Sequence, residues 1–209
     1  MFKQILTFSC ALLLCACAGM SVKPHDSRIH NLKKVDFFAE GKQQAAFKVT
    51  GSMEGMQMDG VVTAKKIGEE DVEVTLLTGG LYRVLHAIVS PEGIAYRYVF
   101  KEVDNAVVRG RITQLLDLLF SQPGNFSHAS TKKGLTTLTY KGPRAKETFT
   151  YQADNLYPSS ARTLTTLNKA DLTYGEYMPI SADGEVQVPH ELVYKDGKII
   201  LELQLISLR

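Results

Sequence analysis

The chain has 209 residues, and its 24 Lys and Arg against 22 Asp and Glu give a formal net charge of +2 at pH 7. Such a small charge leaves no electrostatic footprint for nucleic acid. The length suits one domain with a full hydrophobic core, in which Phe and Tyr supply the aromatic side chains because the chain has no Trp.

The N-terminus has the pattern of an exported protein. Lys3 precedes an apolar run, residues 5–14, that is shorter than the roughly 20 residues needed to span a bilayer. The run leads into a Leu-Cys-Ala-Cys segment that resembles the lipobox of bacterial lipoprotein signal peptides, with Leu14, Ala16 and Cys17 in the expected places. The alternative is an ordinary secretory signal with incidental cysteines.

The lipobox resemblance implies cleavage after residue 16 and a diacylglyceryl group on the sulfur of Cys17, a palmitate-type anchor that holds the protein on a membrane. Cys10 would leave too short an apolar run, and Cys15 would place a large Leu directly before the cleavage point. No cysteine other than Cys17 remains after cleavage, so we expect no disulfide. Ala18 stands where an Asp would retain a lipoprotein in the inner membrane, which favours the outer membrane and its periplasmic face.

We expect residues 17–27 to be the lipidated Cys and a flexible tether, and residues 28–209 to form one domain. A short helix is predicted within residues 28–40, because Ile29, Leu32 and Phe37 could share a face. Alternating apolar runs separated by turn residues then predict a meander of antiparallel strands. The expected strands are 45–53, 56–67, 71–78, 81–90 and 94–102.

A long amphipathic helix is predicted at residues 107–120, with Asp104 or Asn105 as its cap. Its apolar stripe consists of Val108, Ile112, Leu115, Leu116 and Leu119. Strand 81–90 is apolar on both faces and needs a cover, which this helix provides. Strands are predicted again at 135–141, 147–153, 163–174, 185–188 and 191–208, the last turning at 195–197. The pattern predicts one antiparallel sheet, strongly curved or partly closed, with an inserted helix.

This order resembles the LolA/LolB superfamily, the periplasmic carrier and outer-membrane receptor of lipoprotein localisation. The segments that carry the resemblance are AFKVTG at 46–51, GVVTA at 60–64, 72–78, LLTGGL at 76–81, VPHELV at 188–193 and 199–206. The resemblance implies a mainly β fold, an incomplete, half-closed antiparallel β-barrel with helices as a lid over an apolar cavity. The chain departs from the receptor in having Gly79-Gly80 where the receptor has Asn-Pro, and in lacking Trp. A related lipoprotein of the same fold with another ligand is the alternative.

The resemblance also implies where ligands would bind. Leu81 and Tyr82 would form a loop that enters the membrane or receives cargo, although an inward-facing Leu81 at the start of a strand is the alternative. The lid would be the helix 107–120. Nine side chains are predicted to line the cavity, with an ordinary packed core as the alternative for each of them. They are Phe47, Val49, Met58, Val62, Val74, Leu76, Leu85, Tyr96 and Tyr98.

Patterns of catalysis and metal binding are weak. Met53, Met56 and Met58 could hold copper(I), but Met also fills apolar sites that accept varied chains, so we expect no metal. The histidines, among them His86, His128 and His190, are scattered, and none has the spacing of a metal-ligand motif. Nucleophile elbows and phosphate-binding loops are absent from the sequence. We therefore expect a non-enzyme without a cofactor.

The functional prediction is an outer-membrane lipoprotein that binds an acylated or otherwise hydrophobic molecule, most simply receiving lipoproteins and passing them to the outer membrane. Its partners would be the acylated lipoprotein, a LolA-like periplasmic carrier and, through the anchor, the membrane. We expect a monomer that binds no nucleic acid. The alternatives are an interaction lipoprotein that docks an envelope protein complex, and a binder of a different lipid or glycolipid.

Overall fold

The computed structural model describes residues 27–53, 55–79, 82–166 and 168–209. It contains twelve strands, two α-helices and a short 3-10 helix, η1. The helices are α1 (Ser27–Asn31), η1 (Lys101–Val103) and α2 (Ala106–Phe120). The first five strands are β1 (Gln44–Met53), β2 (Met56–Lys66), β3 (Val72–Thr78), β4 (Tyr82–Ser90) and β5 (Gly93–Val99). After α2 come β6 (Asn125–Lys132), β7 (Leu135–Lys141), β8 (Lys146–Gln152), β9 (Pro158–Leu164), β10 (Lys169–Pro179), β11 (Gln187–Asp196) and β12 (Ile199–Leu208).

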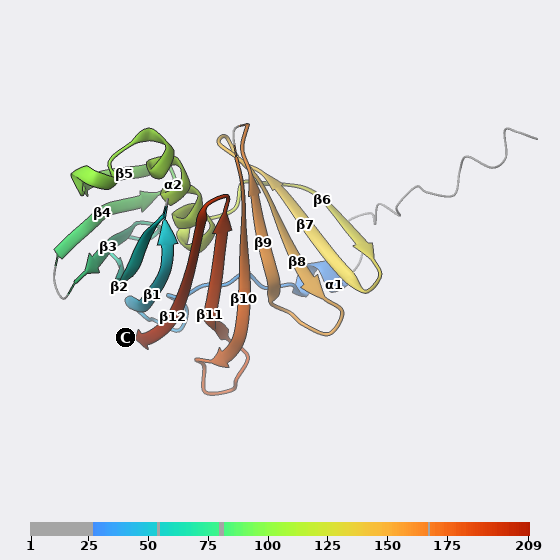
Figure 1. Cartoon of the computed structure of the whole chain (residues 1–209). Coiled ribbons are helices and arrows are strands. Elements are labelled where there is room, and N and C mark those ends of the chain that lie inside the picture. Colours follow the sequence, from blue (N-terminus) through green and yellow to red (C-terminus); the bar gives the residue numbers. More distant parts are fainter. Residues whose placement is uncertain (1–26, 54, 80–81, 167) are drawn as a thin grey trace, which may run out of the picture.

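All twelve strands belong to one antiparallel sheet in the order β5-β4-β3-β2-β1-β12-β11-β10-β9-β8-β7-β6. The sheet is strongly curved, but its end strands β5 and β6 do not pair, so the barrel stays open (Figure 1). In the chain, η1 and α2 connect these two end strands. The predicted mainly β, incomplete barrel is therefore confirmed.

The alternation of apolar side chains fixes which face of each strand is inside. In β12, Ile199, Leu201, Leu203 and Leu205 are buried and the residues between them are exposed, as predicted. Phe47 on β1 pairs with Leu205 on one side and with a β2 residue on the other. A one-residue slip would turn this whole set toward solvent, so the burial pattern strongly specifies the register.

Helix α2 lies across the inner face of the sheet and contacts β4, β9 and β10. Asn105 caps it, because the Asn105 Oδ1 atom accepts a hydrogen bond from the Val108 backbone N–H at 2.9 Å. Asp104, the other predicted cap, instead pairs with Arg109. Of the predicted stripe, four residues are buried and Ile112 is partly buried against the core. The helix therefore covers the sheet, as its sequence pattern predicts.

The N-terminal prediction of a helix within 28–40 is correct only for α1. Residues 32–43 form no helix or strand, yet Val35 and Phe37 are buried. The Phe37 ring meets the Phe47 ring edge to face, with centroids 5.1 Å apart. The apolar spacing that suggested a helix thus reflects a non-helical segment that places these side chains in the core.

The C-terminal half contains a strand that the sequence analysis missed and a break that it did not foresee. Strand β6 has little apolar alternation because it is an end strand, and Ala129 is its one buried side chain. The predicted strand 163–174 is divided between β9 and β10. The turn between them is held by Thr165, whose backbone N–H donates to the Asn168 carbonyl at 2.9 Å. None of the helices in the described residues is both long and apolar enough to cross a membrane.

Candidate functional site

The predicted cavity lining on β1–β4 lies in two packed clusters. Phe47, Val49, Val74, Leu76 and Leu85 are at most 6% exposed, and Met58 and Val62 are partly buried against both clusters. The side chains of α2 fill the space above them, and Leu116 joins the cluster formed by β3 and β4. In this conformation these residues form a core beneath the lid.

The two predicted lining tyrosines lie on opposite faces of β5. Tyr96 faces the lid, where its hydroxyl lies 2.8 Å from the Thr113 Oγ1 atom and donates to the Arg109 carbonyl oxygen at 3.0 Å. Tyr98 instead pairs with His86 and is 43% exposed. A bulge between His86 and Ala87 shifts the register, so strict alternation fails between the two tyrosines. Tyr98 is therefore not a lining residue.

A hollow of about 1010 Å³ lies at one end of the barrel, where α1, the β8–β9 turn and the β10–β11 connection come together. Its buried floor is formed by Tyr157, Pro158 and Tyr174, with Tyr177 partly buried beside them. Leu32 and Leu156 add apolar surface, while charged and amide side chains form the rim. The combination of an aromatic floor and a polar rim is typical of sites for small amphipathic ligands.

Hydrogen bonds hold two of these tyrosines in place. The Tyr157 hydroxyl donates to the Glu185 carbonyl oxygen at 3.1 Å and accepts from the Gln187 backbone N–H at 2.9 Å. The Tyr177 hydroxyl donates to the Pro158 carbonyl oxygen at 2.6 Å, and its ring lies 5.2 Å from that of Tyr157. The floor of the hollow is therefore fixed before any ligand arrives.

The rim is tied to the floor through the segment after α1. The Lys33 backbone N–H donates to the Leu156 carbonyl oxygen at 2.8 Å, and the Lys33 ammonium donates to the Glu185 carbonyl oxygen at 2.7 Å. The ammonium also lies 5.8 Å from the ring centre of Tyr157. Burial raises the pKa of Tyr174 and Tyr177 well above the ordinary value, so both hydroxyls stay neutral near pH 7.

Sequence reasoning missed this hollow, although a signal was present. Three of the nine tyrosines line the hollow, and all three, Tyr157, Tyr174 and Tyr177, fall within residues 157–177. Their contribution to one site depends on the β8–β9 and β10–β11 connections meeting at the same end of the sheet. The two connections lie together because of the strand order, which the local sequence pattern does not reveal.

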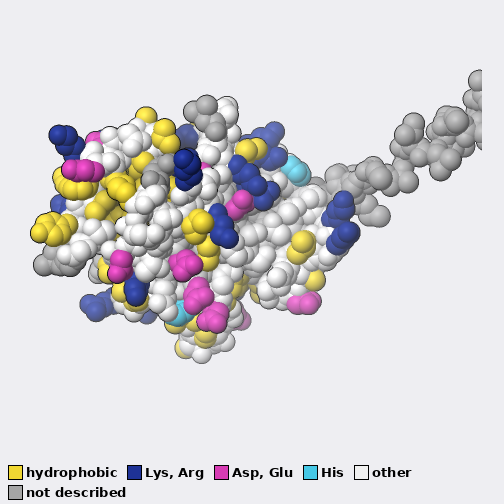
Figure 2. Space-filling view, viewed as in Figure 1, with side chains coloured by type: hydrophobic (Ala, Val, Ile, Leu, Met, Phe, Trp, Pro, Cys, Tyr) yellow, Lys and Arg dark blue, Asp and Glu magenta, His cyan; other side chains and the backbone are white. Residues whose placement is uncertain are grey.

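The predicted loop is only partly described. Cys17 and Leu81 lie outside the described residues, whereas Tyr82, the first residue of β4, is 77% exposed. Beside Gly79, an apolar groove of about 470 Å³ on the outer face contains Val61, Leu77 and Ile206. Figure 2 shows hydrophobic side chains gathered on the side of the molecule that carries β2–β5.

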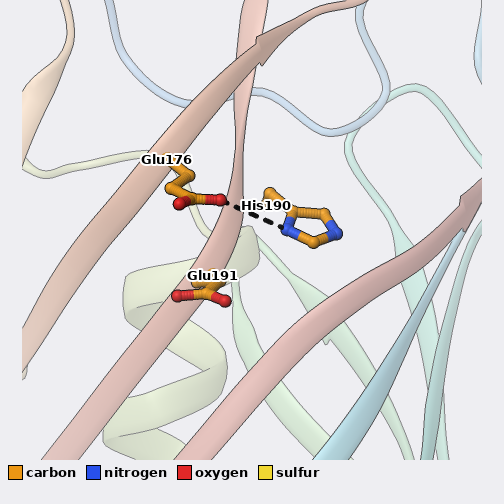
Figure 3. Close-up of side chains that lie close together, drawn as sticks. All are labelled: Glu176, His190 and Glu191. Carbon is orange, nitrogen blue, oxygen red and sulfur yellow. Dashed lines mark ion pairs between the residues drawn. The ribbon is translucent and has the colours of Figure 1, made fainter.

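One set of potential metal ligands occurs in the described residues. The carboxylates of Glu176 and Glu191 and the imidazole of His190 offer ligand atoms within 4.8 Å of one another (Figure 3). The Nδ1 atom of His190 lies 4.0 Å from a Glu176 carboxylate oxygen. Both carboxylates are exposed, so this group is a surface cluster on β10 and β11. Of the three methionines considered for copper, Met53 is buried in the core and Met56 is 43% exposed.

Comparison with solved structures gives three matches at low sequence identity. A LolA superfamily protein from Nitrosomonas europaea is 11% identical, and the match covers 80% of this chain and 85% of that one with a TM-score of 0.57. A putative outer membrane lipoprotein-sorting protein domain from Vibrio parahaemolyticus is 9% identical, and the match covers 87% of this chain and 88% of that one with a TM-score of 0.47. A DUF1329 family protein from Desulfovibrio piger is 10% identical, and the match covers 81% of this chain and 86% of that one with a TM-score of 0.46.

No protein-family model and no curated protein sequence matches the chain. The first of the three structures matches across most of both chains with a TM-score of 0.57, which indicates a shared fold. The chain therefore has the LolA-like fold.

Proposed function

We propose that this protein is a non-catalytic lipoprotein that binds an acylated or otherwise hydrophobic molecule within its open barrel, most simply receiving lipoproteins and passing them to the outer membrane. The observation that carries the proposal is the tyrosine-floored hollow of about 1010 Å³ at one end of a LolA-like sheet. Its volume is at the upper end of the range for ligand pockets, which suits a chain with a bulky head group.

The chemistry of the hollow suits an amphipathic ligand. Aromatic rings at the floor offer apolar surface to acyl chains, and the Tyr157 and Tyr177 hydroxyls already have partners in the backbone. The charged rim can stay hydrated around a polar head group. A bound acyl chain would gain about 0.8 kcal/mol for each methylene removed from water, so even partial burial gives useful affinity.

The proposed location follows from the N-terminal sequence. A lipid on Cys17 followed by Ala18 would place the domain on the periplasmic face of the outer membrane. There it would act as a monomer, accepting cargo from a LolA-like periplasmic carrier. Tyr82, together with the neighbouring Leu81, would provide the contact with the bilayer.

A second candidate function is supported by the packed region under α2. Because β1–β4 and the helix form a solid core, ligand binding is not the sole use for this fold. An interaction lipoprotein would instead use the outer groove of Val61, Leu77 and Ile206 to dock an envelope protein. A third candidate function is a carrier of another lipid or glycolipid, which would use the same hollow as the lipoprotein receptor.

Bound lipid distinguishes these functions. Protein released from membranes in a gentle detergent should carry noncovalently bound acyl species, distinct from its own lipid on Cys17, that mass spectrometry detects. Leu156→Arg places a charge at the hollow and should remove them, whereas Leu135→Arg is the matched control. The two leucines are 47% and 44% exposed, and Leu135 does not line the hollow. Wild-type protein that is consistently empty would favour the interaction lipoprotein.

The lipoprotein-receptor role is tested in cells. Depletion of the protein should cause outer-membrane lipoproteins to accumulate in the periplasm or the inner membrane. If lipoproteins sort normally while the purified protein still carries acyl species, the cargo is a different lipid or glycolipid.

A further inference from the structure

A second groove lies at the opposite end of the barrel from the tyrosine hollow. Turns of an antiparallel sheet alternate between its ends, so the β9–β10 and β11–β12 turns lie away from the hollow. The groove of about 490 Å³ runs between α2 and the β9–β10 turn, with Val107 and Gly110 on the helix side and Thr163 and Ala145 opposite. Val107 is 59% exposed, and a Cβ built on Gly110 would meet nothing within 4 Å.

A buried carboxylate organises the inner wall of this groove. Asp196 is 1% exposed, and its two oxygens accept from the Asn168 Nδ2 atom at 2.7 and 2.6 Å. The Tyr194 hydroxyl lies 3.3 Å from Asp196 and donates to the Arg111 backbone carbonyl at 3.0 Å, which ties the sheet to α2.

This network settles the orientation of the Gln114 amide. A carboxylate accepts hydrogen bonds, so the Asn168 atom facing Asp196 must be the donating nitrogen. The same nitrogen lies 3.3 Å from the Gln114 Oε1 atom, which must therefore be the acceptor. The Gln114 Nε2 atom is left as a donor, and it is buried without a hydrogen-bond partner in the described structure. Gln114 itself is 5% exposed and contributes to the groove.

An unpaired buried donor is unusual, because it loses its hydrogen bonds to water and gains none in return. An oxygen acceptor from a ligand would satisfy it. The atom is closed off in this conformation, so α2 must shift slightly to admit that acceptor. Val107 is largely exposed and Gly110 has open space beside it, so neither of these two residues resists such a shift.

The charges around the groove select a neutral acceptor. Arg144 lies 3.1 Å from Asp117, and Arg111 lies 3.8 Å from Asp196, so each guanidinium already faces a carboxylate. An added anion would meet two carboxylates and no uncompensated cation. A carbonyl oxygen has the acceptor strength without the charge, and acyl esters and amides provide it next to an apolar chain.

We propose that the groove beside α2 takes an acyl chain whose ester or amide carbonyl oxygen accepts a hydrogen bond from the Gln114 side-chain amide. This inference rests on the proposed function, because it assumes an acylated ligand, and it specifies which part of the ligand the lid helix recognises. The tyrosine hollow at the other end would recognise the remainder.

The test compares two short-chain probes that differ in their carbonyl groups. Dihexanoyl phosphatidylcholine has ester carbonyls, and its dihexyl ether analogue has none. Both are titrated as monomers into the full mature chain with Cys17→Ser, which lacks the lipid. The protein with an unaltered groove should bind the ester about tenfold more tightly than the ether, as expected for one hydrogen bond to a buried donor.

Gln114→Met keeps the side-chain length but removes the donor, so it should weaken ester binding about tenfold and leave ether binding unchanged. Gly110→Leu fills the groove while favouring the helix, and it should weaken both probes without lowering the melting temperature. Equal binding of ester and ether to the wild type, or an ester preference that survives Gln114→Met, overturns this inference alone. Failure of the wild type to bind either probe overturns the proposed function as well.

Discussion

Two regions of the barrel have the same alternation of side chains along their strands, but one region is filled and the other is hollow. Under α2, the inner faces of β1–β4 meet Phe37 and the leucines of the helix, and the space is filled. Beside α1, where β8–β11 end, the Tyr157 and Tyr177 hydroxyls bond to backbone atoms, and a hollow remains. The difference shows that an inward-facing apolar position lines a cavity only where nothing from the rest of the chain covers it.

The largest effect is expected in the filled region. Phe47 is fully buried and packs edge to face on Phe37, so Phe47→Ala should cost about 3 to 5 kcal/mol of unfolding free energy, measured by urea denaturation. Ligand affinity per folded molecule should stay unchanged. A cost below about 1 kcal/mol would show that this region is as open as the hollow.

A pH effect is expected at the seam between the two regions, where Glu147 on β8 lies near Lys34. Burial raises the pKa of Glu147 to about 7, partly offset by Lys34. Because the unfolded pKa is about 4.3, this group contributes stability that is present below that pH and is lost as the pH rises through 7. Burial lowers the pKa of Lys34 to about 8, so Lys34 stays protonated over this window.

Glu147→Gln should therefore flatten the fall in stability between pH 4.5 and 7, by up to about 3 kcal/mol over the window. Urea denaturation at a series of pH values measures the slope. Glu202→Gln, at an exposed position on β12, is the control and should keep the wild-type slope. An unchanged slope in Glu147→Gln would mean that the carboxylate is ionised throughout.

A smaller effect is expected at the floor of the hollow. Tyr157→Phe removes two hydrogen bonds and leaves the Gln187 backbone N–H without its partner, which should cost about 1 to 3 kcal/mol of unfolding free energy. Because the hydroxyl organises the rim, binding of an acyl probe should weaken as well. Tyr98→Phe, on the outer face, should alter neither property, and any loss of probe binding there would contradict the assignment of the two faces.

The smallest effect on stability is expected at the loop before β4. Leu81→Glu should change the unfolding free energy by less than about 0.5 kcal/mol if the side chain lies at a loop tip. Cargo binding should persist while delivery to membranes is lost. A large drop in melting temperature would instead identify Leu81 as a core residue, since a buried unpaired charge is costly.

The sequence predicts the fold best where local pattern and global position agree. The alternation in β12 and the apolar stripe of α2 each specify one buried face, and both are confirmed. The alternation places Tyr98 on the wrong face of β5, because the bulge that shifts the register is set by pairing with β4. Strand β6 has no clear pattern, because an end strand needs no apolar face. The hollow was not foreseen, since its residues meet only through the order of the strands.

The open barrel leaves β5 and β6 with one unpaired side each, and such edges are templates for strand addition and fibril growth. The sequence of β6 offers a poor template. Residues Asn125 to His128 are exposed and mostly polar, and the strand ends in Lys132. On β5, Arg97 interrupts the aromatic pair Tyr96 and Tyr98. These side chains disfavour edge-to-edge polymerisation where many copies crowd one surface.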